Sequence, residues 1–510
     1  MPNQNKLFSV TMPPIAALLR RSEDISHLES IKVLLGWDME TYMPTGGETA
    51  RGEQMAAIAV AIHEKEASPR VGEILEDIDE ISDFLNDYDE ALVRIMRRRH
   101  RIATLVPASL ISRLSQATTT SVNEWGRAKK TNNFAAFCGP LERTLDLLRK
   151  RAEILQRGTG RQLYDVFLDD YEPGATQAQI DPLFDALKTT IRGALERIDQ
   201  SGTRQSDAIL RDIKPDKVRL DPFIRIVLSA MGFDFERGRL DESKHPFMEG
   251  IHPSDVRITT RYTEPNFMEP VASAMHEAGH GLYGQGHDMR LVRALLAGGA
   301  SMAVHESQSR FWENQIGKSE TFWSYWLPIL KRHAPGCENH IKDATHLIGM
   351  LRAVRRNPVR LDSDELTYNL HIALRYEIER DLVAGRLSVG DLPQAWNERI
   401  FNYLGIEVKN DAEGVLQDTH WGSGLIGYFP TYAIGNLMAA QIKYAMERDI
   451  TPPTDNPERV PEWMLSMREW LRTKIHTHGR TYSPDETLER ATGEALDPAY
   501  FDRYVRENFG

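Results

Sequence analysis

Two histidines and a glutamate stand close together in the segment HEAGH at 276–280. In a helix, His276 and His280 lie one turn apart on the same face, so both imidazoles can reach one tetrahedral Zn²⁺ at about 2.0–2.1 Å. Glu277 is displaced around the helix, where it can take a proton from an activated water without binding the metal. The segment therefore predicts a zinc site in which Glu277 is the general base.

A catalytic zinc also needs a third protein ligand. One known arrangement places a further histidine a few residues after the motif, behind a glycine. His287 comes seven residues after His280, which is not that spacing, and the glycines between them predict that the helix ends first. We therefore expect the third ligand to come from another helix.

The segment SMAVHESQSRFWENQ at 301–315 is typical of that second helix and offers three candidates, His305, Glu306 and Glu313. His305 and Glu306 point about 100° apart around a helix axis, so only one of them can face the metal. The spacing favours Glu306 and leaves the other two as alternatives. Arg310, one turn after Glu306, is placed to pair with that carboxylate and orient it.

The elements that must hold these residues are mostly helical. Apolar residues recur every three or four positions from Ile180 to Ile198, behind a predicted N-cap at Thr176. A similar pattern over 83–113 is broken by Pro107. The best strand signal is the alternating, β-branched segment 255–262. We expect one mainly α-helical domain, with a small β-sheet just before residue 270.

Composition excludes several classes of protein. The chain has 510 residues, 41% of them hydrophobic, which is enough for a large core and too apolar for a disordered chain. Its length alone favours about three domains. The net charge of −12 argues against nucleic acid as a partner. Only two cysteines, Cys138 and Cys337, are present, which predicts a cytoplasmic protein and a metal site without thiolates.

No charged residue occurs from Trp421 to Ile442, a length that could span a bilayer. The segment contains Pro430, Asn436, Gln441 and four glycines, which are poorly suited to a membrane helix. We therefore predict a buried internal segment and no membrane association.

Several motifs, in this order, resemble those of the Taq carboxypeptidase family (thermostable carboxypeptidase 1-like zinc metallocarboxypeptidases). They are HPF at 245–247, DVRIT at 255–259, HEAGH at 276–280, HESQ at 305–308, VRLDSD at 359–364 and GVLQDTHW at 414–421. The fifth departs from the family pattern at Val359 and Ser363 but keeps Arg360 and Asp364. Segments at 37–47, 164–174 and 492–500 extend the resemblance over nearly the whole chain.

The resemblance implies an enzyme that releases single amino acids from peptides with a free C-terminus, with broad specificity. It implies that His276, His280 and Glu306 bind Zn²⁺, for which Co²⁺ can substitute. The implied fold is a single elongated helical domain, residues 1–510, with a deep active-site groove. The N-terminal helices, about 1–110, are expected to form part of the groove wall, and family members are typically homodimers.

The oxyanion formed during peptide hydrolysis needs a hydrogen-bond donor besides the metal. His420, within the family motif, and Tyr428 and Tyr432, in the uncharged segment, are the candidates. The alternative for either tyrosine is packing in the core with a satisfied hydroxyl group.

A carboxypeptidase must also recognise a carboxylate, for which the planar guanidinium of arginine is suited. Arg360 is the best candidate within the family motifs, and Arg257 is the second, with an ion pair to a nearby carboxylate as its alternative role. His245 can donate to substrate or cap a loop. Composition and spacing do not separate an exopeptidase from an endopeptidase, so this assignment rests on the resemblance.

Two other functions are alternatives to a carboxypeptidase. One is an endo-oligopeptidase on a similar helical groove fold. The other is a catalytically silent helical scaffold, against which the intact set of metal-binding residues and Glu277 argues.

Overall fold

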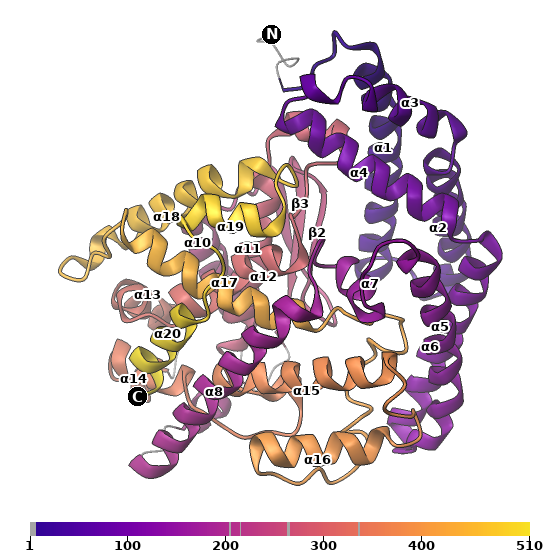
Figure 1. Cartoon of the computed structure of the whole chain (residues 1–510). Coiled ribbons are helices and arrows are strands. Elements are labelled where there is room, and N and C mark those ends of the chain that lie inside the picture. Colours follow the sequence, from indigo (N-terminus) through magenta and orange to yellow (C-terminus); the bar gives the residue numbers. More distant parts are fainter. Residues whose placement is uncertain (1–6, 203–205, 215, 263–265, 335–336) are drawn as a thin grey trace. The chain divides into compact units, whose positions relative to one another are not determined.

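The computed structural model describes residues 7–202, 206–214, 216–262, 266–334 and 337–510. These residues form a mainly helical protein with one small sheet, as the sequence predicts (Figure 1). The chain divides into two compact units. The first comprises Met1–Thr104, Asp207–Leu351 and Gln441–Leu496, and the second Leu105–Ser206, Arg352–Ala440 and Asp497–Gly510.

The first unit contains the sheet and most of the helices. Its α-helices are α1 (Pro13–Thr41), α2 (Glu48–Glu66), α3 (Pro69–Asp79), α4 (Asp87–Leu105), α9 (Ala208–Asp212), α10 (Lys217–Met231), α11 (Glu269–Gly286), α12 (Met302–Arg310), α13 (Glu320–His333), α14 (Ala344–Leu351), α18 (Val460–Lys474) and α19 (Pro484–Thr492). Its short helical segments are η1 (Thr45–Gly47), η2 (Ser82–Phe84), η3 (Met289–Ala294), the π-helical η4 (Phe311–Ile316), η5 (Cys337–Asn339), η7 (Pro457–Arg459) and η8 (His476–His478).

The second unit is built from helices alone within the described residues. They are α5 (Ala108–Thr131), α6 (Phe134–Gln156), α7 (Leu163–Asp169), α8 (Gln177–Ser201), η6 (Arg360–Asp362), α15 (Glu365–Val383), α16 (Leu392–Leu404) and α20 (Ala499–Phe509). Helix α17 (Pro430–Glu447) begins in the second unit and ends in the first.

Neither unit is a continuous stretch of chain. The unit boundaries fall after Thr104, Ser206, Leu351, Ala440 and Leu496, so both units are assembled from three segments each. Independent domains are usually joined by a single exposed linker, which is not the connectivity of this chain. The single domain, its elongated form and its groove remain predictions.

The local structure follows the sequence patterns closely. Thr176 is the N-cap of α8, and the side chain of Gln179 accepts a hydrogen bond from its backbone N–H at 2.9 Å. This pair forms a capping box. Helix α4 ends at Leu105, and α5 begins directly after Pro107. The predicted strand at 255–262 is β3, at Asp255–Thr260.

Strand β3 is the centre of a three-stranded sheet. It pairs in parallel with β1 (Gly238–Glu242) and antiparallel with β2 (Met248–His252). Helix α11 follows β3 in the chain and packs on β3 and β2, next to α12 (Figure 1). The sheet thus fixes the helix that carries the HEAGH motif.

Helices α11 and α12 approach each other closely at Gly279. A Cβ atom at this position would lie 2.6 Å from the carbonyl oxygen of Gln308 and 2.7 Å from Cα of Ser309. Backbone atoms of a packed helix cannot yield as a side chain can, so the contact requires glycine. It brings the α11 motif within reach of the side chains of α12.

The uncharged segment at 421–442 is largely buried, as predicted. It runs through a loop into α17, and Ile426, Phe429 and Leu437 are at most 1% exposed. Among the described residues, no helix combines the length and apolar character needed to cross a bilayer.

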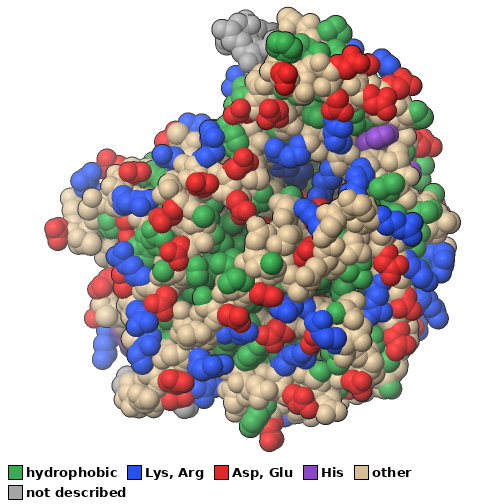
Figure 2. Space-filling model, viewed as in Figure 1, with side chains coloured by type: hydrophobic (Ala, Val, Ile, Leu, Met, Phe, Trp, Pro, Cys, Tyr) green, Lys and Arg blue, Asp and Glu red, His purple; other side chains and the backbone are tan. Residues whose placement is uncertain are grey.

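Charged side chains of both signs are interspersed on the face drawn in Figure 2, and neither sign collects into one broad patch.

We predict that Gly279→Ala destabilises the first unit by about 1–3 kcal/mol, because the new methyl group forces α12 away from α11. Thermal unfolding followed by circular dichroism measures the change. The control is Gly52→Ala in α2, where a Cβ meets nothing within 4 Å. Equal melting temperatures for the two variants would contradict the prediction.

Candidate metal centre

Three side chains of the first unit converge on one point. His276 and His280 from α11 and Glu306 from α12 each offer a ligand atom within 4.8 Å of the others. Oε2 of Glu306 lies 3.6 Å from Nε2 of His276 and 3.4 Å from Nε2 of His280. Ligand atoms about 2.1 Å from a tetrahedral zinc lie about 3.4 Å apart, so the set has the dimensions of a zinc site.

Local structure places each ligand. The hydroxyl group of Ser301 accepts a hydrogen bond from the backbone N–H of Val304 at 3.1 Å, which caps α12 one turn before Glu306. His287 lies just beyond the end of α11, where its Nδ1 contacts the carbonyl of Gly284 at 3.1 Å. It is not part of the ligand cluster, as expected.

Glu313, an alternative ligand by spacing, lies behind His276 instead. Its Oε2 is 2.7 Å from Nδ1 of His276, the ring nitrogen that does not face the cluster. A carboxylate in this position accepts the Nδ1 proton, fixes the tautomer and makes the other nitrogen a stronger ligand. Glu313 belongs to the π-helical segment η4, a type of distortion frequent at functional sites.

His305, the other alternative, lies behind His280. Its carbonyl oxygen is 3.0 Å and its Nδ1 2.6 Å from Nδ1 of His280. Burial strongly lowers the pKa of His305, so its ring is neutral and can accept the proton of His280. The two imidazole ligands therefore have partners of different charge, a carboxylate for His276 and neutral acceptors for His280.

Arg310 joins the two carboxylates. Its Nε donates to Oε1 of Glu306 at 2.6 Å, and its Nη1 donates to Oε2 of Glu313 at 3.1 Å. Burial opposes ionisation of both acids, but Arg310 and His276 outweigh it, so the pKa of Glu306 falls well below its usual value and that of Glu313 to about 2. Both groups are anionic at neutral pH.

The excess of negative charge favours a cation at the cluster. Burial acts to lower the pKa of His276, yet Glu306 and Glu313 raise it to about 9. The two carboxylates thus stabilise a positive charge on or next to the His276 ring. A divalent metal ion would supply that charge in place of the His276 proton.

Glu277 lies on the same helix as the two histidines and is 6% exposed. Burial raises the pKa of its carboxyl group, and His276 and His280 partly offset the rise. A raised pKa makes the carboxylate a better proton acceptor, as its expected role as general base requires.

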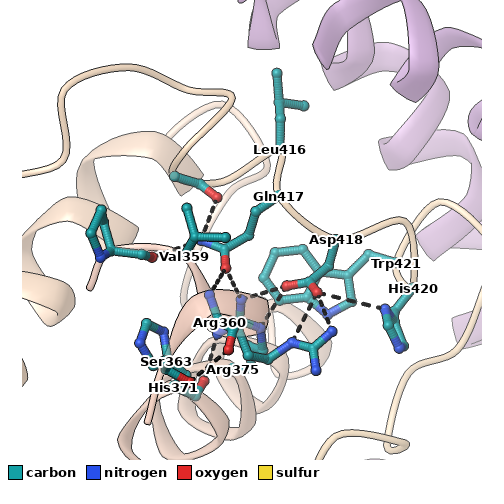
Figure 3. A network of polar contacts seen from close by, with 12 residues as sticks. Val359, Arg360, Ser363, His371, Arg375, Leu416, Gln417, Asp418, His420 and Trp421 are labelled. Carbon is teal, nitrogen blue, oxygen red and sulfur yellow. Dashed lines mark hydrogen bonds and ion pairs between the residues drawn. The ribbon is translucent and has the colours of Figure 1, made fainter. Parts of the chain in front are cut away.

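The second unit contains a separate buried network of charges around Asp418 (Figure 3). Oδ1 of Asp418 accepts hydrogen bonds from Arg360, at 3.0 Å from Nε and 2.8 Å from Nη2. Oδ2 accepts one from Nε of Arg375 at 2.7 Å. The side-chain oxygen of Gln417 joins both arginines, through the backbone N–H of Arg360 and Nη2 of Arg375.

This network has a net positive charge. Burial opposes ionisation of Asp418, but Arg360 and Arg375 hold its pKa far below the usual range. Burial lowers the pKa of His420 to about 4, so this imidazole is neutral at pH 7. Two guanidinium groups against one carboxylate leave one uncompensated positive charge, an arrangement suited to an anion.

The predicted substrate residue Arg360 is already engaged. Besides its two bonds to Asp418, its Nη1 donates to the hydroxyl of Tyr368 at 3.1 Å. Of its five N–H donors, two remain within the described part of the chain, one on each terminal nitrogen.

Two further predicted residues, Arg257 and His245, belong to the first unit. Arg257 forms a two-bond ion pair with Asp255, at 2.8 and 2.9 Å, and its guanidinium lies 5.7 Å from the ring centre of Trp37. His245 is exposed, and its carbonyl accepts a hydrogen bond from Ser243 at 2.6 Å.

Aromatic contacts connect the remaining predicted residues. The rings of His420 and Tyr428 are 5.7 Å apart, and those of Tyr428 and Tyr432 are 5.3 Å apart. The guanidinium of Arg360 lies 5.6 Å from the Tyr432 ring. The second unit thus gathers four of the predicted site residues, Arg360, His420, Tyr428 and Tyr432.

Sequence reasoning missed Arg375, a fully buried member of the network. Its signal is a charged residue inside the otherwise uncharged segment NLHIALRY of α15. Charged residues are almost never buried without a partner, so such a position predicts a tertiary ion pair. The identity of the partner is not readable from the local sequence.

Comparison with known proteins gives consistent matches along the whole chain. A family model described as carboxypeptidase Taq (M32) metallopeptidase matches residues 17–509. The chain is 36% identical over 501 residues to thermostable carboxypeptidase 1 of Pyrococcus furiosus, covering 98% of each. It is 37% identical over 511 residues to thermostable carboxypeptidase 1 of Thermus thermophilus, covering 98% of this chain and 99% of the relative.

The structural matches agree. The structure of Pyrococcus furiosus carboxypeptidase Apo-Mg has a TM-score of 0.93 and 35% identity, covering 98% of this chain and 99% of that one. The crystal structure of the M32 carboxypeptidase from Deinococcus radiodurans R1 has a TM-score of 0.91 and 33% identity, with coverage of 98% and 99%.

We predict that Glu313→Gln weakens zinc binding by about tenfold, the low end of the range for partners of metal ligands. Glutamine keeps an acceptor for the His276 N–H but removes the negative charge. Competition with a chromogenic chelator measures the affinity. Glu320→Gln, an exposed residue in the first turn of α13, is the control and should bind zinc like the unaltered chain. Equal affinities for both variants would remove Glu313 from this role.

Proposed function

The chain belongs to the carboxypeptidase Taq (M32) metallopeptidase family, and from this premise we propose that its metal is zinc, bound by His276, His280 and Glu306. As a member of this family it is a metallocarboxypeptidase, a hydrolase that acts on peptides. The observation that carries the metal assignment is the convergence of the three ligand atoms within 4.8 Å.

The donor set supports zinc over magnesium. Two imidazole nitrogens and one carboxylate are typical of catalytic zinc sites, whereas Mg²⁺ demands about six oxygen ligands. Co²⁺ accepts the same donors, so we propose it as a functional substitute. When bound, the metal supplies Lewis-acid chemistry, which acidifies water and polarises the scissile carbonyl.

We propose that Glu277 carries the proton transfers. Its carboxylate accepts a proton from the attacking water and then delivers that proton to the leaving amine, so that the base is regenerated in each turnover. Its low exposure and raised pKa support both steps, because the protonated form is stabilised between them.

We further propose that the network of the second unit handles the substrate. The uncompensated charge of Arg360 and Arg375 suits the free carboxylate of a peptide C-terminus, and Arg360 keeps two N–H donors for it. His420 and Tyr428 are proposed as donors to the negative charge that develops on the scissile carbonyl oxygen. Tyr432, Arg257 and His245 remain proposed substrate contacts.

The cellular setting follows from the same resemblance. We propose a homodimer that acts in the cytoplasm and releases single amino acids with broad specificity. Light scattering coupled to size-exclusion chromatography tests the dimer.

Glu277→Gln should keep the bound zinc and lower kcat by about 10²–10⁴-fold, because the amide cannot accept the water proton. Metal analysis and steady-state kinetics on the same sample separate the two effects. Glu269→Gln, an exposed position in the first turn of the same helix, is the control. A Glu277→Gln enzyme with a near-normal rate would show that another group is the base.

The unaltered enzyme should shorten a peptide from its C-terminus and leave the same peptide intact when that terminus is amidated. Chelation should stop the cleavage, and added Zn²⁺ should restore it. Mass spectrometry of both peptides, with and without chelator, gives all four results. Cleavage of the amidated peptide at internal bonds would favour an endo-oligopeptidase, and unchanged cleavage under chelation would refute a metallopeptidase.

A further inference from the structure

Helix α15 contains a carboxylate that the proposed mechanism does not use. Glu379 is fully buried in the second unit. Its Oε1 accepts a hydrogen bond from the indole Nε1 of Trp421 at 2.8 Å. Its Oε2 accepts one from the hydroxyl of Tyr164 at 2.7 Å and one from the backbone N–H of Gly427 at 2.9 Å.

Two of these three donors mark the ends of one loop. Trp421 directly follows His420, and Gly427 directly precedes Tyr428. Glu379 therefore binds the loop at both ends, next to the two residues whose rings lie 5.7 Å apart. A single carboxylate thus holds together the two ends of the loop that separates His420 from Tyr428.

The loop also packs closely against the backbone of α7 at Gly427. This residue has φ +85°, and a Cβ atom there would lie 2.6 Å from the backbone carbonyl carbon and oxygen of Phe167 in α7. Only glycine combines this conformation with this approach. Because glycine has no side chain to anchor the loop at this point, the loop is bound here through its backbone N–H, which donates a hydrogen bond to Glu379.

We propose that Glu379 is a positioning residue that fixes His420 and Tyr428 for substrate by binding both ends of the loop between them. The proposal rests on the substrate roles proposed above for those two residues.

The three donors make glutamate difficult to replace. An ionised carboxylate accepts all three hydrogen bonds. A protonated one also satisfies all three partners, because the hydroxyl of Tyr164 can reverse and accept the proton while Trp421 and Gly427 still donate. Burial raises the pKa of Glu379 to about 7, so both forms are populated near neutral pH.

Glutamine in place of Glu379 cannot satisfy all three hydrogen-bond donors. Its amide nitrogen donates only, so it faces the indole N–H of Trp421 in one orientation and the N–H of Gly427 in the other. Either orientation releases one end of the loop. Glu379→Gln, close to glutamate in size, therefore tests the bonding pattern with little change in volume.

The first test is kinetic. Glu379→Gln in the full-length enzyme should lower kcat/KM, per bound zinc, by roughly 10- to 100-fold, as loss of a partner behind a functional side chain does at metal sites. Zinc content should not change, because the metal ligands belong to the first unit. The matched control is Glu377→Gln on the same helix, whose carboxylate accepts from Tyr403 at 2.6 Å and Lys188 at 2.8 Å.

The second test separates positioning from a general loss of stability. Tyr164→Phe removes one buried hydrogen bond to Glu379 but leaves the bonds to Trp421 and Gly427, and so both loop ends, in place. Its stability should fall, whereas its kcat/KM should stay close to that of the unaltered enzyme. Besides Tyr164, the titratable or charged groups that face Glu379 are Arg375 on α15 and Tyr171 after α7, both of which this variant retains.

Trp421→Phe covers the case in which Glu379→Gln does not fold, because it removes one loop bond and keeps an aromatic ring. It should also lower kcat/KM at unchanged zinc content. The proposal would be overturned if Glu379→Gln had the same kcat/KM as Glu377→Gln. If Glu379→Gln does not fold, the same comparison is made with Trp421→Phe. A kcat/KM for Tyr164→Phe that falls as far as that of Glu379→Gln would also overturn the proposal. An unaltered enzyme that removes no C-terminal residue would instead overturn the proposed function.

Discussion

The need to compensate buried negative charge governs the metal centre. Glu306 is 5% exposed, and a carboxylate removed from water is stable only when cations or N–H donors surround it. Arg310 supplies one partner on the same helix, and α11 supplies two imidazoles across the contact at Gly279. Glu313 adds a second negative charge behind His276, so the two carboxylates exceed the single permanent positive charge of Arg310. A divalent cation at the proposed site would complete this balance, which would make it part of the structure of the site as well as of its chemistry.

The second unit also compensates a buried carboxylate, but there the surplus charge around it is positive. Asp418 is held between two arginines, and the surplus charge is positive. Glu379, one turn after Arg375 on α15, accepts hydrogen bonds from three neutral donors, and the nearby charge of Arg375 also favours its ionised form. One buried helix thus carries an arginine that organises the charged network and a glutamate that organises the neighbouring loop. Both act on the segment from Gln417 to Tyr428, in which the family motif and the uncharged stretch meet.

Sequence patterns were sufficient for features that depend on local spacing. The helical turn that relates His276 to His280, the N-cap at Thr176, the break at Pro107 and the strand before α11 are all set by residues near one another in the chain. The position of Glu313 was not predictable in this way. In an ideal α-helix Glu313, seven residues after Glu306, would lie on the same face as Glu306. The π-helical turn η4 changes that register. Arg375 and Glu379 were missed because their partners are distant in sequence, and a buried charge reveals only that a partner exists.

The network around Asp418 also changes the expected form of carboxylate recognition. The sequence predicts Arg360 as the candidate for carboxylate recognition, and in the structure Asp418 already accepts from its Nε and Nη2. The remaining donors lie on the two terminal nitrogens, so a substrate carboxylate can meet Arg360 only end-on. In the proposed role, the net attraction would come from the second guanidinium, Arg375, which is fully buried and shares the single charge of Asp418. If Arg360 binds the substrate as proposed, loss of Arg375 would leave its charge neutralised by Asp418, so the proposed specificity for a free carboxylate would depend on a residue that need not touch the substrate.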